Sequence, residues 1–297
     1  MPRFSVRRLA LVLPLLLAGC SSAADPVQET SSPPPPFPQP APFRRVFVVV
    51  LENADAEEAL QQPYLRKLAN RGALLSRSAF VARPSQPNYL AMTSGGIHGV
   101  ATNDPVTRDV RHLGDLLEEK GRTWKSYTED YPGGCFLGAE SPAGHYVRKH
   151  QPFLTYKNVQ DDPARCARVV PATELSADVR NRTLADFSLF IPNNENNGHE
   201  PKDVAFAARW LERTFEPLLQ DRAFLDGLLF VVTFDESEKS HTRPIYTVLL
   251  GDGVQPGAVT DFPYNHYSLL RTIEDGLGLG TLGREDAKAV PIGGVWR

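Results

Sequence analysis

Two continuous apolar runs, each ending in a pair of polar side chains, constrain the fold of this chain most strongly. Residues 44–53 read RRVFVVVLEN, and residues 228–237 read LLFVVTFDES. Both runs are too short for an isolated helix and rich in β-branched and aromatic residues, which is typical of strands covered on both faces. The chain is therefore expected to form a sheet that is buried between layers of helices.

Helix and strand patterns alternate between and around these two runs. Helices are predicted at residues 63–72, 111–121 and 203–219, where apolar residues recur at helical spacing and glycine ends the first two. Strands are predicted at 123–129, 186–192 and 246–251. This alternation indicates an α/β fold, a three-layer sandwich around a mostly parallel sheet, in one domain over residues 43–297.

The first twenty residues have the pattern of an export signal. Arg3, Arg7 and Arg8 precede an apolar run that ends in Leu-Ala-Gly-Cys, residues 17–20. This junction resembles a bacterial lipobox, so residues 1–20 are predicted to be a lipoprotein signal peptide and Cys20 the lipidated residue. Ser21 favours an exported protein anchored at the outer membrane and facing the periplasm. An ordinary secretory signal remains the alternative.

Residues 21–42 are rich in serine and proline and are predicted to form an extended tether. Removal of residues 1–20 leaves 29 basic and 35 acidic side chains, a formal charge of −6, which argues against a nucleic-acid partner. Cys135 and Cys166 then remain as an even pair in an oxidising compartment. A disulfide between them is predicted, with two independent thiols as the alternative.

The polar pairs that end the two apolar runs are candidate metal ligands. Glu52 and Asn53 follow the first run, and Asp235 and Glu236 follow the second. Ligands bind beyond the carboxyl ends of strands in such sheets, and several carboxylates brought together require a compensating cation. One divalent metal ion is therefore predicted here, although each pair alone could be a turn or a helix cap.

Ser85 lies between two prolines in RPSQPNYLAMTSGG, residues 83–96. Pro87 suits the first turn of a helix that runs to about Ser94 and ends before Gly95. Ser85 would then face free backbone N–H groups and the positive end of the helix dipole, a position that binds phosphate and stabilises an alkoxide. The alternative is that Ser85 merely caps the helix.

Three stretches supply histidines and further polar groups. VRKHQPF contains Arg148, Lys149 and His150, which could meet a dianion or could form a solvated charged surface. IPNNENNGHE follows a predicted strand and ends near His199. His266, in FPYNHYSLL, is expected to begin a helix and is a candidate substrate contact.

These stretches, taken in order, resemble the acid phosphatase and phospholipase C phosphoesterase family of the alkaline phosphatase superfamily. The matching segments are VVVLEN, PSQPNYLAMTSG, YVRKHQPF, FIPNNENNGHE, VVTFDES and YNHYSLLRTIE. The pattern is most similar to secreted mycobacterial phosphoinositide phosphatases and fungal phosphate-repressible acid phosphatases. The resemblance implies an alkaline-phosphatase-like sandwich and hydrolysis of small phosphomonoesters or phospholipid-derived substrates.

The resemblance also implies a role for each candidate residue. Ser85 would be the nucleophile and would complete a metal site made by Glu52, Asn53, Asp235 and Glu236. His199 and His150 would contact the phosphate and the leaving group, and Asn88, Lys149 and His266 would bind substrate. The chain departs from the family at Ala54-Asp55-Ala56, which follows the glutamate motif, and at Glu236, which replaces the second aspartate of some members.

Two other functions remain open at this stage. A phospholipase C type of phosphodiesterase belongs to the same family, although the short domain leaves little sequence for a lipid-recognition module. A lipoprotein that binds a phosphorylated ligand without turning it over is the alternative outside enzymes. A sulfatase is disfavoured because SQPNY lacks an arginine two residues after the proline.

Overall fold

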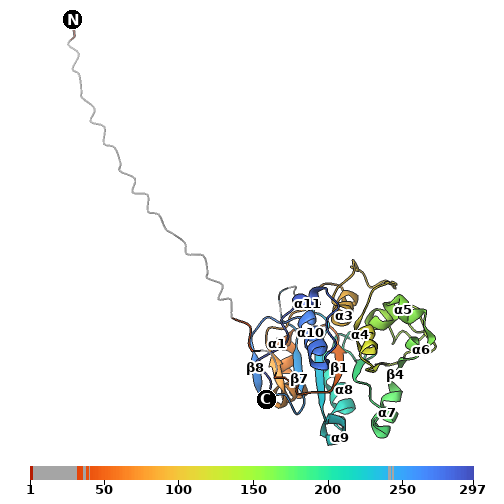
Figure 1. Cartoon of the computed structure of the whole chain (residues 1–297). Coiled ribbons are helices and arrows are strands. Elements are labelled where there is room, and N and C mark those ends of the chain that lie inside the picture. The colour runs from red at the N-terminus through yellow and green to blue at the C-terminus, as the bar shows by residue number, and fades with distance from the viewer. Residues whose placement is uncertain (3–31, 36–37, 40, 240–241, 243) are drawn as a thin grey trace. The chain divides into compact units, whose positions relative to one another are not determined.

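A computed structural model describes residues 1–2, 32–35, 38–39, 41–239, 242 and 244–297 (Figure 1). The predicted signal peptide, Cys20 and most of the predicted tether lie outside the described residues, so these remain predictions. Pro35 is described, and its carbonyl accepts a hydrogen bond from the Gly294 amide at 3.3 Å. Within the described part of the chain, no helix combines the length and the apolar character needed to cross a membrane.

The centre of the fold is an eight-stranded sheet in the order β4-β3-β5-β1-β6-β7-β2-β8. The strands are β1 (Arg45–Leu51), β2 (Ala73–Leu75), β3 (Trp124–Thr128), β4 (Val169–Pro171), β5 (Phe187–Ile191), β6 (Leu228–Phe234), β7 (Thr247–Leu250) and β8 (Ala258–Thr260). β7 runs antiparallel to both of its neighbours, and every other pairing is parallel. The predicted mostly parallel sheet is therefore confirmed.

Helices cover both faces of this sheet (Figure 1). The α-helices are α1 (Ala56–Gln61), α2 (Pro63–Arg71), α3 (Ser85–Ser94), α4 (Leu113–Glu119), α5 (Lys157–Gln160), α6 (Pro163–Cys166), α7 (Leu175–Asn181), α8 (Val204–Phe215), α9 (Arg222–Leu225), α10 (His266–Leu277) and α11 (Glu285–Lys288). Side chains from α3, α4 and α10 pack on one face, and side chains from α2, α7 and α8 pack on the other.

The sequence of β1 explains why both faces need a cover. Val46, Val48 and Val50 point into one hydrophobic cluster, while Phe47 and Val49 point into the other. Successive side chains of a strand alternate between faces, so a run without polar residues buries both sides of the sheet. β6 repeats this arrangement beside β1, and all seven of its residues are buried.

The longer predicted elements are confirmed, whereas three short strands were not anticipated. The predictions at 123–129, 186–192 and 246–251 correspond to β3, β5 and β7, and the three predicted helices correspond to α2, α4 and α8. β2, β4 and β8 have three residues each. Segments of three residues are too short to show the periodicity of a strand. Pairing with neighbouring strands, rather than their own residues, holds these segments in place.

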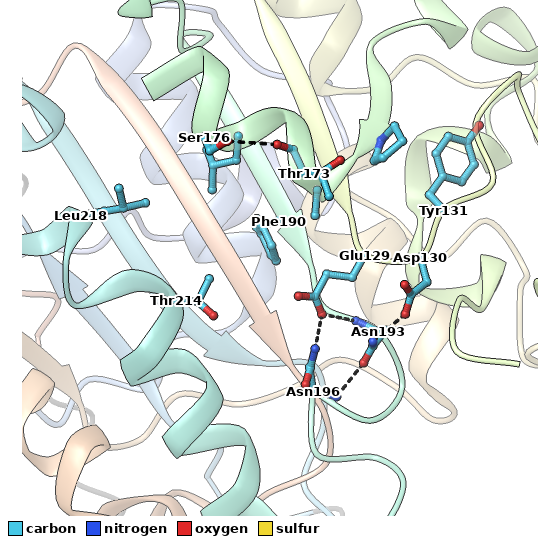
Figure 2. A pocket seen from close by; sticks show the side chains of 13 residues that line it. Glu129, Asp130, Tyr131, Thr173, Ser176, Phe190, Asn193, Asn196, Thr214 and Leu218 are labelled. Atoms are coloured by element: carbon cyan, nitrogen blue, oxygen red, sulfur yellow. Dashed lines mark hydrogen bonds between the residues drawn. The ribbon is translucent and has the colours of Figure 1, made fainter. Parts of the chain in front are cut away.

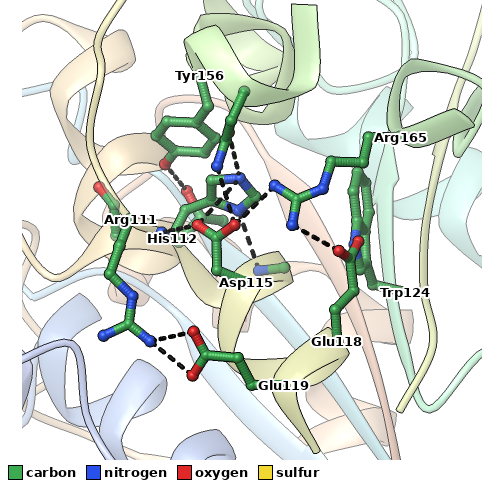
Figure 3. A network of polar contacts seen from close by, with 12 residues as sticks. Arg111, His112, Asp115, Glu118, Glu119, Trp124, Tyr156 and Arg165 are labelled. Carbon is green, nitrogen blue, oxygen red and sulfur yellow. Dashed lines mark hydrogen bonds and ion pairs between the residues drawn. The ribbon is translucent and has the colours of Figure 1, made fainter. Parts of the chain in front are cut away.

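A polar network holds α4, α5 and α6 together beside the sheet (Figure 3), and a disulfide ties α6 to the loop that contains Cys135. The His112 Nδ1 atom accepts from the Gly114 amide at 3.0 Å and caps α4, and its Nε2 atom lies 3.0 Å from Asn158 Oδ1. Arg165 of α6 donates to Asp115 at 2.7 Å. The predicted disulfide is present in the structure, and it joins the next residue, Cys166, to Cys135 with the Cα atoms 5.6 Å apart.

Candidate active site

The two polar pairs come together because β1 and β6 are adjacent parallel strands. Leu51 pairs with Phe234 at the carboxyl end of both strands, and the Asp235 amide donates to the Leu51 carbonyl at 3.0 Å. Glu52 and Asp235 are the next residues, and both are buried. Asn53 adopts a left-handed backbone conformation with φ of 49°, and its amide lies 3.4 Å from Asp235 Oδ1.

Ser85 is the first residue of α3 and faces these acids. Its hydroxyl donates to Glu52 Oε2 at 3.1 Å and lies 3.5 Å from Glu236 Oε1. Only 2% of Ser85 is exposed. The predicted helix from Ser85 to Ser94 is confirmed, so the hydroxyl lies at the positive end of the helix dipole.

Glu52 is surrounded by aromatic groups that hold its carboxylate in place. The Tyr89 hydroxyl donates to Glu52 Oε1 at 2.5 Å, and His150 Nε2 lies 3.2 Å from the same oxygen. The His150 ring stacks on Tyr89 with the centroids 5.2 Å apart. On its other side, His150 Nδ1 lies 3.5 Å from Asn197 Nδ2. His150 therefore contacts the carboxylate that faces Ser85 and is fully buried behind it.

The three buried carboxyl groups divide the negative charge unequally. Burial opposes ionisation of Glu52, but His150, Lys149 and the Tyr89 hydroxyl outweigh burial and lower its pKa to about 2. Burial and repulsion from Glu52 and Glu236 raise the pKa of Asp235 well above its usual range. Burial also raises the pKa of Glu236, to about 7, although Arg83 opposes this. Without a further cation, the state in which one of the three carboxyl groups is ionised is favoured over the state in which all three are ionised.

Several oxygen atoms at this point of the sheet have no hydrogen-bond partner among the residues that the structure describes. They are Asn53 Oδ1, Asp235 Oδ2 and Glu236 Oε2, all buried. Buried polar atoms are nearly always paired, so unpaired oxygens at one site favour a missing cation. Among the described residues, no three His, Cys, Asp or Glu side chains form a ready-made metal cluster. The donor set fits a hard divalent ion only if Asn53 and Ser85 contribute oxygens.

His199 and Lys149 lie next to each other, close to His150. Lys149 Nζ is 3.4 Å from His199 Nε2, and the ring centroids of His199 and His150 are 6.2 Å apart. Asn197 Oδ1 accepts from the His199 amide at 2.8 Å, and the backbone carbonyl of Asn197 accepts from the Glu52 amide at 3.0 Å. Burial and the Lys149 charge lower the pKa of His199. The loop after β5 thus connects His199 to the end of β1.

Two predicted substrate contacts have other partners in the structure. Asn88 Oδ1 accepts from the amides of Val81 and Ala82 at 2.9 and 3.0 Å, and its Nδ2 donates to the Ala82 carbonyl at 2.7 Å. His266 begins α10, as predicted, and its Nε2 lies 2.6 Å from the Asp235 carbonyl. Both side chains therefore hold the backbone that carries site residues, and substrate binding by them stays a prediction.

Sequence reasoning missed Tyr89 and Arg83. Tyr89 follows Ser85 by four residues, so it lies one helical turn along the same face, and this spacing was the available signal. The Arg83 guanidinium lies over Phe80 at 5.3 Å, and its Nε is 3.7 Å from Glu236 Oε2. Arg83 precedes the Pro84-Ser85 pair, and a cation so close to a candidate nucleophile could have been singled out.

Residues 49–280 match the family described as Phosphoesterase family. The chain is 34% identical over 261 residues to a probable acid phosphatase of Kluyveromyces lactis, covering 84% of this chain and 62% of that protein. It is 32% identical over 260 residues to a phosphatidylinositol-3-phosphatase of Mycobacterium tuberculosis, covering 86% of this chain and 83% of that protein. The chain thus spans less than two thirds of the yeast relative.

A solved structure supports the assignment of the fold. A protein in the alkaline phosphatase superfamily from Vibrio parahaemolyticus superposes with a TM-score of 0.57 at 15% identity, covering 84% of this chain and 72% of that one. At this identity the likeness concerns the fold alone. The expected alkaline-phosphatase-like α/β architecture is confirmed.

Proposed function

Because the chain belongs to the phosphoesterase family, we propose that it hydrolyses phosphomonoesters in the manner of an acid phosphatase, with Ser85 as the nucleophile. The observation that carries the proposal is the position of the Ser85 hydroxyl. It lies at the first residue of α3, hydrogen-bonded to a charged and buried Glu52 and close to Glu236. The N-cap position of α3 is occupied by Pro84, and the Ser85 hydroxyl is directed at the two carboxylates instead of at a backbone N–H of the first turn.

The proposed reaction has two steps at Ser85. The Ser85 oxygen attacks phosphorus, the bond to the leaving oxygen breaks, and Glu52 Oε2 is placed to take the hydroxyl proton. His199 in its protonated form supplies a proton to the leaving oxygen, and Lys149 beside it favours the phosphate dianion. Burial and Lys149 lower the pKa of His199, so its protonated form depends on the negative charge of the bound phosphate. Water then cleaves the Ser85 phosphoester and releases inorganic phosphate. Positive charge around the phosphoryl oxygens would contribute most of the rate acceleration.

We also propose that one divalent metal ion belongs to this site. Glu52, Asn53, Asp235, Glu236 and Ser85 would hold it through oxygen atoms. Three of these oxygens have no hydrogen-bond partner among the described residues, although Arg83 Nε lies 3.7 Å from Glu236 Oε2. When bound, such an ion would stabilise the negative charge of the Ser85 oxygen and of the phosphoryl group. Tyr89 and His150 orient Glu52 for this role, and His266 fixes the backbone of Asp235.

The proposed substrate is a small phosphomonoester, including phosphoinositide head groups. The support is the name of the mycobacterial relative, of which this chain covers 83%. The lipobox-like residues 17–20 support export and attachment to the outer membrane through Cys20, with the domain in the periplasm. Phosphodiester cleavage is the second candidate, and the two are separated by comparing p-nitrophenyl phosphate with bis-p-nitrophenyl phosphate.

Replacement of the nucleophile tests the proposal. Ser85→Ala is expected to lower kcat on every phosphomonoester by at least about 10³-fold, because no phosphoenzyme can form. Ser94→Ala is the matched control, since Ser94 is also buried in α3 but donates to the Leu90 carbonyl at 2.8 Å. Phosphate release and trapping of a phosphoserine by mass spectrometry are the measurements. Comparable activity of the two variants would contradict the role of Ser85.

Removal of metal tests the second part of the proposal. Exhaustive treatment with a chelator is expected to lower kcat by about tenfold or more, and one divalent ion should restore it. Elemental analysis of the purified protein identifies the ion. Full activity of a protein that contains no metal would refute the metal site without refuting Ser85 as nucleophile.

A further inference from the structure

A cavity whose lining does not include Ser85 lies at the carboxyl ends of β3 and β5 (Figure 2). Its volume is about 740 Å³. Ligands of parallel sheets bind beyond the carboxyl ends of the strands, so the location is suited to a small molecule. Nothing in the proposed phosphatase reaction uses this space.

The lining of the cavity combines two carboxylates with an apolar wall. Glu129 and Asp130 follow β3 directly, and Tyr131, Phe190 and Leu218 supply aromatic and aliphatic surface (Figure 2). No lysine, arginine or histidine is among the described residues that line it. Two acids without a basic partner attract cations and repel the phosphates for which the other site is suited.

The two carboxylates are held in place by the loop after β5. Glu129 Oε2 accepts from the Asn193 amide at 3.0 Å and from Asn196 Nδ2 at 2.7 Å, and Trp210 Nε1 lies 3.2 Å from Glu129 Oε1. Asp130 Oδ2 accepts from Asn193 Nδ2 at 2.7 Å. Burial raises the pKa of Glu129, and a bound cation would favour its charged form. Glu129 is therefore preorganised by three donors, while Asp130 is exposed at the rim and is oriented by one hydrogen bond.

We propose that this cavity binds a small organic cation with an apolar body, the ammonium group beside Glu129 and Asp130 and the body against Phe190 and Leu218. The proposal does not depend on the phosphatase reaction. The same loop also carries Asn197 and His199 of the candidate active site, so a ligand here contacts a segment that both sites share.

Three probes that share one ring and differ in charge test the proposal. They are benzylammonium, benzyl alcohol and benzoate, titrated into the full-length protein. The indole N–H of Trp210 is the reporter, because it contacts Glu129, and the other two tryptophans of the chain serve as internal controls. Benzylammonium is expected to shift the Trp210 signal with an affinity about tenfold higher than benzyl alcohol, and benzoate is expected not to bind.

Variants assign the probe to the cavity. Asp130→Asn and Glu129→Gln should each weaken benzylammonium about fivefold or more while leaving benzyl alcohol nearly unchanged. Ser176→Phe should block both probes, since Ser176 is exposed at the lining. Glu195→Gln, which removes one charge from the same loop outside the lining, should change nothing and is the matched control. If Glu129→Gln fails to fold, the Asp130 and Ser176 variants carry the test.

Several results would overturn the proposal. These are equal affinity for benzylammonium and benzyl alcohol, binding of benzoate in preference, no Trp210 shift at about 50 mM probe, or equal effects of Asp130→Asn and Glu195→Gln.

Kinetics then identify the source of the cation. If benzylammonium competitively inhibits hydrolysis of an aminoalkyl phosphate but does not inhibit hydrolysis of p-nitrophenyl phosphate, the cavity binds the alcohol part of the substrate. Binding that leaves both reactions unchanged assigns it to a separate ligand. Since binding persists in Ser85→Ala under this proposal, its failure and that of the phosphatase proposal are distinguishable.

Discussion

His199 differs from Glu52 and His150 because it is only partly buried and is linked to the fold mainly through its backbone. Its amide is held by Asn197, while its Nε2 atom contacts Lys149 at 3.4 Å. Glu52, by contrast, is fixed by Tyr89 and His150 from behind. A residue held by its backbone can lose its side chain without collapse of the site, so its chemical role can be measured by substitution.

His199→Ala is expected to lower kcat/KM on an alkyl phosphate by roughly 10²-fold, and distinctly less on p-nitrophenyl phosphate. The reason is that a general acid matters most when the leaving oxygen is strongly basic. His145→Ala is the control, because His145 is exposed and contributes only its carbonyl, which accepts from the Asn194 amide at 2.9 Å. Equal losses on both substrates would identify His199 as a phosphate or metal contact instead, and His150 would become the leading acid.

At the scale of elements, α6 is a short helix that depends on its connections. It has four residues, and it is attached through Arg165 to Asp115 and Glu118, at 2.7 and 2.6 Å, and through Cys166 to Cys135. A helix this short is not stable by its own hydrogen bonds. Its position therefore follows from the ion pairs and the disulfide.

Removal of this disulfide is expected to destabilise the domain without altering the candidate active site. The bond spans 31 residues, which corresponds to about 3.7 kcal/mol in the loop-entropy account. Cys135→Ser combined with Cys166→Ser should lower the free energy of unfolding in urea by about that amount. Reductant should reproduce the shift in the wild-type protein and leave the double variant unchanged. A wild-type protein in which both thiols react freely with an alkylating reagent would contradict the bond.

At the scale of the whole molecule, one buried acid far along α10 from the site makes stability depend on pH. Glu274 is fully buried, and neither of its carboxyl oxygens has a hydrogen-bond partner among the described residues. Burial and the nearby Asp286 raise its pKa from 4.5 to about 9. The folded protein thus holds this proton between about pH 4.5 and 9, where the unfolded chain has released it.

Stability is therefore expected to fall as pH rises through this range, by up to about 1.4 kcal/mol per pH unit from this group. Glu274→Gln keeps the shape but cannot ionise, so it should raise Tm at pH 8 more than at pH 5. Glu285→Gln, an exposed acid, is the control. Thermal unfolding at both pH values is the measurement, and a variant with the same pH dependence as wild type would show that Glu274 is charged when folded.

The sequence by itself determined the parts of this protein that depend on local composition. An apolar run such as Val46–Leu51 has few alternatives to a buried strand, and Glu52 and Asp235 must follow such strands at the same edge of a parallel sheet. Pro87 lies in the first turn of α3 and Gly95 caps its end, so the position of Ser85 at the start of this helix was also readable. The order of these motifs was sufficient to recognise the family.

Only the tertiary structure decided which side chains turn toward Ser85 and which are used to hold the backbone. Asn88 and His266 carry the same hydrogen-bonding groups as Asn197 and His150, but the former hold a loop and a strand end, while the latter lie beside the carboxylate that faces Ser85. Likewise, the short strands β2 and β8 are held in place by pairing with each other. β7 runs antiparallel to both of its neighbours, β6 and β2. These outcomes depend on residues that are distant in the sequence. The local sequence pattern does not identify such residues, because folding decides which groups come close enough to form a hydrogen bond.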